Sequence, residues 1–522
     1  MRRTALTAAV IVAVLARVAI AFAAWRGGGV DVFMTPDSQN FVASASALVD
    51  RSRFDDPKGN PEIFRTPGYP LLLAMGHRTG NPIAFTLAVQ FALAAAVVVL
   101  TAGFIAGIAG PRWGVAGAFV AALEPVLLLW SVKIMAETLL VFFIVVFLWC
   151  AWRAMETRDA RWLIGAAVAI SLAAYAKPVA YPLALMTCIA AFLPWGEPAR
   201  GTLRRGGIVL ATCAVLLVPW HVRNARVAGY AGFSSLTDYA LYVSAGGSVE
   251  ARREGQAYAD VRTRLLSRAS AAPRPPYAEM RREGWAQLRS DPAGYAAVHA
   301  QGMFRTLFDP GAIEYLRLFG RYEGAKGALM RAVDLGPLRA FLVLAREQPQ
   351  VLWPTVLLAG LLAPLVLLPL FAIRGLAPEV RRPFALLAAV AAYFVIVGGG
   401  VPGSNRFRVP AIPPLIIMSA VAVRRALLGG TFDVPVILSR GDGEGPPATC
   451  AGVPNRRGSF AALRRLQDDS GFCRAGSQAA RPAALIAAPC GTSFATSPSR
   501  LRSAQRAWPL CVSAAKAPRL RA

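Results

Sequence analysis

The chain has 522 residues, of which 56% are hydrophobic and only 16% are charged. Soluble domains are about 25% charged and about 45–50% apolar, so this composition excludes an ordinary soluble domain and indicates an integral membrane protein. The net charge of +27 would suggest nucleic acid as a partner in a soluble protein. Here much of the excess lies beside apolar segments, where basic residues set topology and meet anionic lipid, so we expect membrane lipid and no nucleic acid as partners.

The first apolar segment predicts a membrane span. It covers residues 5–25 and follows Met1-Arg2-Arg3, and its length is about that needed to cross a bilayer. A signal peptide has a shorter apolar core and a small-residue cleavage site, which residues 21–24 match only weakly. We therefore expect an uncleaved first helix with a cytoplasmic amino terminus.

Nine further apolar segments predict a polytopic protein. They lie at residues 82–108, 114–131, 137–152, 162–176, 178–194, 207–220, 351–373, 384–400 and 409–428. Basic residues collect on the cytoplasmic side of a membrane, and the short outer turns between the third and sixth segments carry only Lys133 and Lys177. We therefore expect an all-α polytopic protein of about ten transmembrane helices in the plasma (inner) membrane, with both termini inside.

This count divides the chain into four parts. Residues 1–220 form an N-terminal transmembrane catalytic module, which includes a first outer loop at 26–81. Residues 221–350 form an extracytoplasmic domain, with helical patterns at 258–270 and 277–288. Residues 351–430 supply the C-terminal transmembrane helices. Residues 431–522 are rich in Pro, Gly, Ser, Ala and Arg and predict a disordered basic tail.

Cysteine and histidine spacing gives no sign of a metal or a disulfide framework. Three of the seven cysteines fall in apolar segments, the other four lie in the last 75 residues, and none has CxxC spacing. The three histidines are scattered. No metal site and no cofactor are expected, and nothing in the sequence indicates a divalent cation.

Two stretches after the first segment carry candidate site residues. Asp37 begins a helical pattern, so it is either an N-cap or a catalytic carboxylate at the outer membrane surface. Arg65 opens the stretch Arg65-Thr66-Pro67-Gly68-Tyr69-Pro70. It is either a headgroup anchor or a phosphate ligand, for which the guanidinium fork is well suited.

Further candidates lie at the ends of later segments. Glu137 opens the fourth span, where the helix dipole also favours a carboxylate, and Lys177 lies at an outer turn where it can anchor or meet a lipid phosphate. Arg406 and Arg408 run against the topological trend in an outer turn, which favours a functional role. The remaining candidates are Arg223 and Asn224, which are caps or ligands, and Glu124, an intramembrane carboxylate of the costly kind.

Taken in order, these motifs resemble one superfamily. The early Asp, the basic-Thr-Pro-Gly-Tyr-Pro stretch, the Glu opening the fourth span, the Pro-Trp-x-x-Arg-Asn end of the seventh and the Arg-Phe-Arg-x-Pro turn resemble the GT-C polyprenyl-phosphate-sugar glycosyltransferases. The nearest kin are protein-mannosyltransferase and aminoarabinose-transferase-like enzymes, including the rhizobial lipopolysaccharide-core type. The resemblance covers about residues 5–428.

The resemblance implies an inverting sugar transfer from a polyprenyl-phosphate donor to an extracytoplasmic acceptor. It makes Asp37 the general base and Glu137 the second acidic residue. It assigns the donor phosphate to Arg65, Lys177, Arg406 and Arg408, and substrate binding to Tyr69, Arg223 and Asn224. The family often has Asp-Glu, or Asp followed shortly by Tyr, in its first motif; here Ser38 follows Asp37, which puts metal assistance in doubt and leaves the acceptor unassigned.

A transporter or lipid flippase is the alternative function. Ten spans and the intramembrane Glu124 fit it. Inverted repeats are not visible in the sequence, and a large loop on one side is unusual for a transporter.

Overall fold

The computed structural model describes residues 2–193, 198–271, 276–322, 336–373, 376, 378–401 and 403–428. These residues fold almost entirely into helices, and the strand-like pairing among them is one isolated bridge between Asp55 and Pro61. The predicted tail, residues 431–522, lies outside the described residues. The all-α class is confirmed for the part of the chain that the structure describes.

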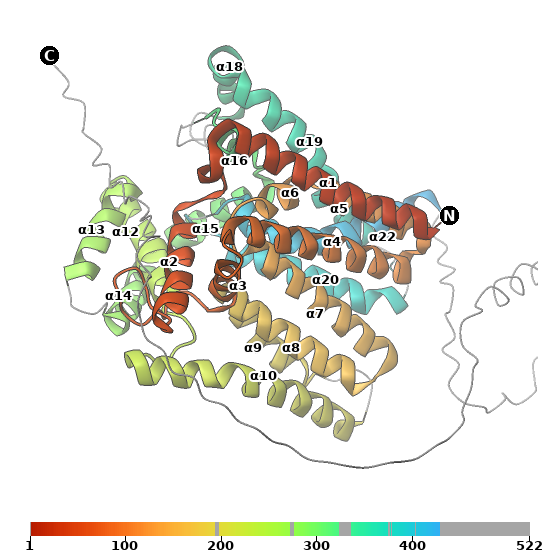
Figure 1. Ribbon diagram of the computed structural model, residues 1–522, viewed down its shortest axis with the longest axis horizontal. Helices are drawn as coiled ribbons and strands as arrows, with labels where there is room; N and C mark the ends of the chain where they lie inside the picture. Colours follow the sequence, from red (N-terminus) through yellow and green to blue (C-terminus); the bar gives the residue numbers. More distant parts are fainter. Residues whose placement is uncertain are drawn as a thin grey trace, which may run out of the picture. The chain divides into compact units, whose positions relative to one another are not determined.

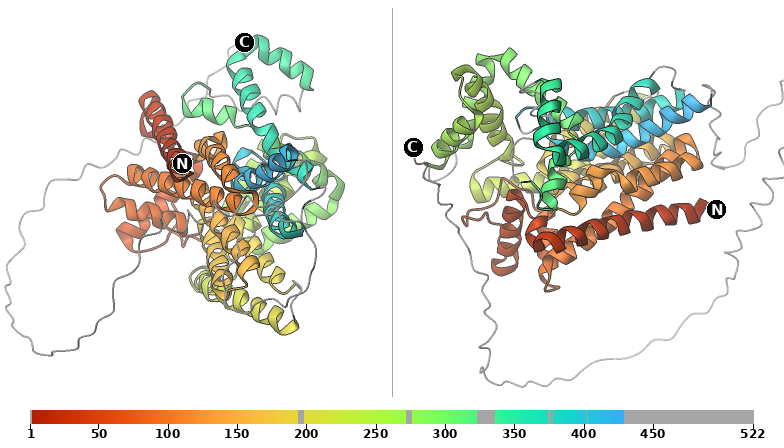
Figure 2. Two further views of the ribbon diagram at one scale, coloured as in Figure 1. Left: turned by 90° about the vertical axis from the view of Figure 1, so that its right-hand side faces the viewer. Right: turned by 90° about the horizontal axis from the view of Figure 1, so that it is seen from above.

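A bundle of apolar helices makes up most of the described chain (Figure 1). Its members are α1 (Arg2–Gly28), α4 (Pro82–Ala109), α5 (Pro111–Leu123), α6 (Pro125–Ser131), α7 (Glu137–Thr157), α8 (Ala160–Ala176), α9 (Tyr181–Ala190), α10 (Ala199–Ala228), α19 (Pro349–Ala372), α20 (Pro378–Val397), α21 (Asn405–Arg408) and α22 (Ile412–Leu427). Figure 2 shows them side by side, with the loop helices gathered at the end away from the amino terminus.

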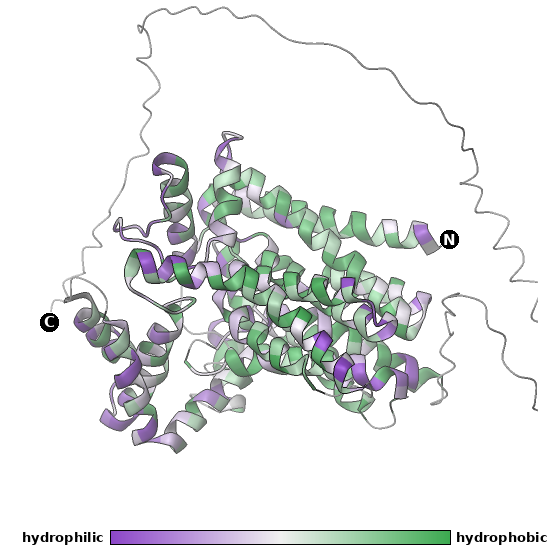
Figure 3. Cartoon of the chain, turned by 90° about the horizontal axis from the view of Figure 1, so that it is seen from below, coloured by the Kyte–Doolittle hydropathy of each residue, from purple (hydrophilic) through white to green (hydrophobic). Residues whose placement is uncertain are grey.

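The bundle is that of a multi-pass membrane protein. By length and composition, seven of the described helices can cross a membrane, and an eighth span is added if the bent pair α5–α6 counts as one. The apolar helices α8 and α9 are shorter, so the predicted count of about ten spans stays a prediction. The span of α22 is 83% buried, which makes it a central helix, whereas that of α4 is 33% buried. Figure 3 shows hydrophobic residues along the bundle helices and hydrophilic ones in the loop helices and at the bundle ends.

The break between α5 and α6 has a local cause. The two helices meet at 51°, where Pro125 lacks the N–H that would continue the helical ladder. The side chain of Glu124 then caps α6 by accepting from the N–H of Leu127 at 2.6 Å. Tyr315 donates its hydroxyl to the carbonyl of Pro125 at 2.6 Å. The intramembrane carboxylate that favoured a transporter therefore has a structural role.

Short helices connect α1 to α4 at the loop end of the bundle. They are η1 (Gly29–Phe33), α2 (Pro36–Arg51) and α3 (Gly68–His77). Gly68 begins α3 against the end of α8, where a Cβ would lie 2.6 Å from the carbonyl oxygen of Tyr175. Since only glycine permits this approach, it places the residues before α3 beside the end of α8.

The loop region is helical, as the two patterns predicted. It contains α11 (Leu236–Tyr239), the π-helix η3 (Ala240–Gly246), α12 (Gly247–Glu254), α13 (Tyr258–Ala271), α14 (Tyr277–Ser290), α15 (Pro292–Phe308), α16 (Ala312–Leu318) and α18 (Pro337–Glu347). A small core of its own forms around Tyr242, Val243, Val261, Leu265 and Met280. Helix α10 continues to Ala228, beyond the boundary predicted at residue 220.

Candidate functional site

The first turn of α2 presents Asp37 without using it as a cap. Thr35 is the N-cap: its side chain accepts from the N–H of Ser38, and the Ser38 hydroxyl accepts from the N–H of Thr35 at 2.9 Å. This capping box satisfies the helix end. The N-cap interpretation of Asp37 is therefore wrong, and its side chain, which is 44% exposed, points to other elements.

Two chain segments, residues 32–38 and 133–137, are bonded to each other beside this turn. The Ser38 hydroxyl donates to the carbonyl of Ile134 at 2.7 Å, and the N–H of Ile134 donates to the carbonyl of Phe33 at 2.9 Å. Lys133 donates to the carbonyl of Val32 at 2.7 Å. These bonds place the start of α2 next to the start of α7, and so Asp37 next to Glu137.

Arg406 joins the two carboxylates. One terminal nitrogen lies 2.7 Å from Oδ2 of Asp37, and its Nε donates to Oε1 of Glu137. Lys177, in the break between α8 and α9, donates to the same Glu137 oxygen at 2.7 Å. Glu137 is 1% exposed, and its Oε2 has no hydrogen-bond partner among the described residues. Four separated parts of the chain thus meet at one point.

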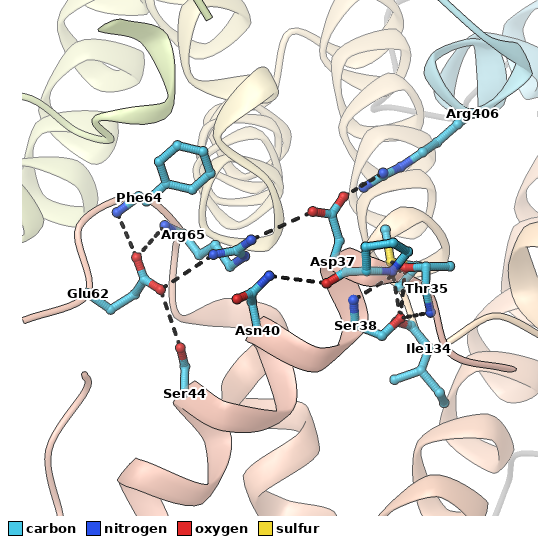
Figure 4. Close-up of polar contacts among 12 residues, drawn as sticks. Thr35, Asp37, Ser38, Asn40, Ser44, Glu62, Phe64, Arg65, Ile134 and Arg406 are labelled. Atoms are coloured by element: carbon cyan, nitrogen blue, oxygen red, sulfur yellow. Dashed lines mark hydrogen bonds and ion pairs between the residues drawn. The ribbon is translucent and has the colours of Figure 1, made fainter. Parts of the chain in front are cut away.

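Arg65 approaches Asp37 from the opposite side to Arg406 (Figure 4). Its guanidinium lies 3.6 Å from Oδ1 of Asp37 and 3.8 Å from Glu62, over the rings of Phe41 and Phe64. The buried Glu62 carboxylate also accepts the backbone N–H groups of Phe64 and Arg65 at 2.8 and 3.0 Å. These contacts hold a stiff turn that aims Arg65 at Asp37.

The charges around Asp37 favour its ionised form. Burial raises the pKa of this carboxyl group, but the positive charges of Arg406, Arg65 and Lys177 outweigh burial and hold the pKa below its usual value. Asp37 is therefore a carboxylate at neutral pH, with three cations around it. No group of three or more His, Cys, Asp or Glu side chains among the described residues is placed to hold a metal ion.

The prediction that Arg408 shares a ligand with Arg406 is wrong. Arg408 is fully buried and donates to the carbonyls of Thr306, Leu307 and Asp309 at 2.8–2.9 Å. It therefore satisfies the last carbonyls of α15. The physical reason lies in α21: two residues apart on a helix do not face the same way, so Arg406 reaches Asp37 while Arg408 points to α15.

Tyr69 is placed in the core. It is fully buried, and its hydroxyl donates to Oε1 of Gln90 at 2.7 Å. Gln90 in turn donates to the carbonyls of Ser131 and Lys133 at 2.8 and 3.0 Å. Tyr69 thus helps to hold the segment before Glu137, and its hydroxyl is committed to Gln90.

Arg223 and Asn224 hold loop backbone. Arg223 donates to the carbonyl of Phe54 at 3.0 Å and to that of Glu62, with its guanidinium 4.8 Å from the Trp220 ring. Asn224 is fully buried and donates to the carbonyls of Gly232 and Phe233, both at 3.0 Å. Arg223 therefore positions the first outer loop, and Asn224 positions the chain that follows α10, in place of the substrate contact that the sequence predicted.

Three positioning residues carried no role in the sequence prediction. Glu62 fixes the turn of Arg65, and Gln90 links Tyr69 to residues 131–133. The role of Gln90 could have been inferred from the sequence, because a polar residue within an apolar span is costly and usually has partners. Asn405 is a third: it accepts from the indole of Trp130 at 2.8 Å and donates to Asp309 at 2.9 Å, which fixes α21 and with it Arg406.

Comparison with known proteins supports the resemblance. Residues 65–222 match the family model described as dolichyl-phosphate-mannose-protein mannosyltransferase, which confirms the resemblance to GT-C polyprenyl-phosphate-sugar glycosyltransferases. The matched segment contains Arg65, Glu137 and Lys177. No curated protein matches the chain, and the rhizobial lipopolysaccharide-core type is not confirmed.

Five chains of solved structures also match. One is the archaeal oligosaccharyltransferase AglB from Archaeoglobus fulgidus in complex with an inhibitory peptide and a dolichol-phosphate, with 13% identity and a TM-score of 0.44 over 90% of this chain. The present chain spans 54% of the AglB chain. Another is ArnT from Cupriavidus metallidurans bound to undecaprenyl phosphate, with 14% identity and a TM-score of 0.36 over 80% of this chain and 77% of ArnT.

Proposed function

We propose that this protein is a membrane glycosyltransferase. It moves a hexosyl or pentosyl group from a polyprenyl-phosphate donor to an extracytoplasmic acceptor, which is a glycan, a lipid or a protein. The observation that carries the proposal is the cluster itself. One half-exposed carboxylate, Asp37, lies among Arg65, Lys177 and Arg406, at the loop end of an apolar bundle.

The cations of the cluster suit a phosphate leaving group. When the bond between sugar and phosphate breaks, negative charge develops on the phosphate, and fixed positive groups stabilise it better than water does. Arg65 and Arg406 offer guanidinium forks, which match phosphate oxygens, and Lys177 adds a compact charge. The family description of residues 65–222 supports a polyprenyl-phosphate-linked donor of this kind.

Asp37 is the general base of the proposed reaction. A single displacement inverts the sugar carbon and needs a base on the face opposite the leaving group, where it takes the proton of the acceptor hydroxyl. A bound phosphate partly neutralises the positive charges of Arg65 and Arg406. Their depressing effect on the pKa of Asp37 then weakens, so Asp37 becomes a better base when the donor is bound.

The place of the cluster suits a lipid carrier. Glu137, Lys177 and Arg406 lie where bundle helices begin or end, and Asp37 lies beside them in the first turn of α2. A phosphate at a bilayer surface can therefore reach them while its polyprenyl chain stays in lipid. The arginine distribution along the sequence supports our proposal that this end faces the extracytoplasmic side of the plasma (inner) membrane.

The test is donor turnover by the purified full-length chain and its Asp37→Asn variant. With radiolabelled polyprenyl-phosphate mannose, the donor that the family description suggests, and a membrane extract that supplies acceptor hydroxyls, transfer of labelled mannose and release of polyprenyl phosphate should fall by about 10²–10⁴-fold in the variant. Asp50→Asn, an exposed position in the last turn of the same helix, is the matched control and should keep the parental rate. Parental turnover by Asp37→Asn would refute the base. Passage of the donor across a vesicle membrane with its glycosyl bond intact would indicate a transporter.

A further inference from the structure

A positively charged hollow lies at the end of the bundle opposite Asp37. Helix α7 starts at Glu137 in the cluster and ends at Thr157, and α8 returns from Ala160 to the cluster at Lys177. Between these far ends and the starts of α10 and α20 is a hollow of about 160 Å³. Its described lining includes Arg158, Arg204, Arg205 and Arg382.

One cation of the lining, Arg205, is held in a fixed position. Arg205 is only 6% exposed, and it donates to the carbonyl of Ala191 at 3.0 Å and to that of Leu193. Its guanidinium is thus anchored at the back of the hollow. Apolar side chains complete the floor: Met155, Leu163 and Ile208.

The other three arginines are exposed and carry uncompensated charge. Within the described residues, the side chains of Arg158, Arg204 and Arg382 form no hydrogen bond or ion pair, and no described lining residue is acidic. The neighbouring carboxylates are committed elsewhere, since Asp159 pairs with Arg161 at 2.7 Å and Glu156 with Arg153 at 2.8 Å. Guanidinium groups that line one hollow without acidic partners repel one another, so an anion in the hollow is favoured.

Arg158 also occupies an unusual backbone position. It ends α7 with φ at 55°, in the left-handed region that glycine usually fills at a helix end. The only other described non-glycine residue with positive φ is Ser52. A glycine here would relieve the backbone but would remove one of the arginines that line the hollow.

We infer that this hollow binds a phosphate group, carried either by an anionic phospholipid headgroup or by free phosphate. Arginine forks match phosphate oxygens, and basic pockets between transmembrane helices bind lipid headgroups of this kind. The apolar floor suits the glycerol and upper acyl chains of a lipid. The site is separate from Asp37, so the inference does not depend on the proposed transfer reaction.

Binding to the purified full-length chain tests the inference. The probes are phosphatidylglycerol in mixed micelles and inorganic phosphate, with phosphatidylcholine as the zwitterionic comparison, measured by native mass spectrometry and by thermal shift. Phosphatidylglycerol should be retained in preference to phosphatidylcholine. Arg204→Gln and Arg382→Gln should each weaken binding about fivefold, from the contribution of one basic residue at an anionic lipid surface.

A matched control separates a built site from diffuse charge. Arg112→Gln removes an exposed arginine at the same end of the bundle, outside the hollow, and should bind like the parent. Arg204→Lys should keep part of the affinity. Binding of inorganic phosphate alone, lost in the two hollow variants, would identify free phosphate as the ligand. Equal losses in Arg112→Gln and Arg204→Gln, or no loss in Arg204→Gln with Arg382→Gln combined, would overturn the inference.

Discussion

Two arginines of the short helix α21 should have different effects on turnover and stability when each is replaced by glutamine. Arg406 contacts the carboxylates of the candidate site, whereas Arg408 satisfies the carbonyls at the end of α15. We predict that Arg406→Gln mainly loses turnover and that Arg408→Gln mainly loses stability. Each variant is a control for the other, because both remove one guanidinium from α21.

The magnitudes follow from the contacts. Removing one group that stabilises transition-state charge costs about 10²–10³-fold in turnover, which we expect for Arg406→Gln. Arg406 donates to two carboxylates; if the glutamine amide keeps one of these bonds, the loss of stability should be about 1.5–3 kcal/mol, the range for one hydrogen bond to a charged group. Lys177 still pairs with Glu137, so the lower end of the range applies.

Arg408→Gln removes three buried hydrogen bonds to carbonyl oxygens. If the glutamine amide keeps one of them, two are lost, and the cost is about 3 kcal/mol or more at about 1.5 kcal/mol each. Molecules that still fold should keep turnover within a few-fold of the parent, because Arg408 does not contact Asp37 or Glu137.

The assay combines thermal stability in detergent, read by size-exclusion after heating, with donor turnover per folded molecule. The reasoning is refuted if folded Arg408→Gln protein loses turnover as completely as Arg406→Gln. It also fails if Arg406→Gln turns over the donor at the parental rate.

Three further outcomes are expected. The pKa of Asp37 is depressed in the folded chain, so its stabilising contribution is present above the unfolded pKa of about 3.9 and is lost as pH falls through the lower folded value. An acid titration of thermal stability should therefore show Asp37→Asn flatter than the parent below about pH 4. Tyr69→Phe leaves Gln90 with an unpaired oxygen, and should cost about 1–3 kcal/mol in thermal unfolding while donor turnover stays within a few-fold. Arg223→Met should make the loop that carries Glu62 more susceptible to limited proteolysis, and an unchanged cleavage pattern would argue against its positioning role.

Much of the helical bundle could be predicted from the sequence, because long apolar segments have few alternatives in a membrane. Each of the ten predicted segments falls on a helix or helix pair. Asp37, Arg65, Glu137, Lys177 and Arg406 could be proposed together because each lies in an outer loop or at a segment end on the same predicted side. The structure brings these five side chains to one cluster.

What could not be predicted depends on local geometry and packing. The cap of α2 is Thr35, two residues before Asp37, because Ser38 completes a capping box that competes with an Asp cap. The burial of Tyr69 depends on Gln90, which lies 21 residues away in another helix. The separation of Arg406 from Arg408 depends on a four-residue helix, which is too short to give a periodic signal.

The bonded segments 32–38 and 133–137 have one further consequence. Hydrogen bonds to the Ile134 backbone, from Lys133 to the carbonyl of Val32 and from Thr35 to the sulfur of Met135 join the two segments, so the scaffold itself holds the start of α2 beside the start of α7. The cations can therefore transfer their bonds to a ligand while the backbone bonds keep the two segments together. When a ligand draws the cations away, the carboxylates of Asp37 and Glu137 are less screened from each other, and their repulsion opposes binding of the ligand. The same repulsion favours return of the cations when the ligand leaves.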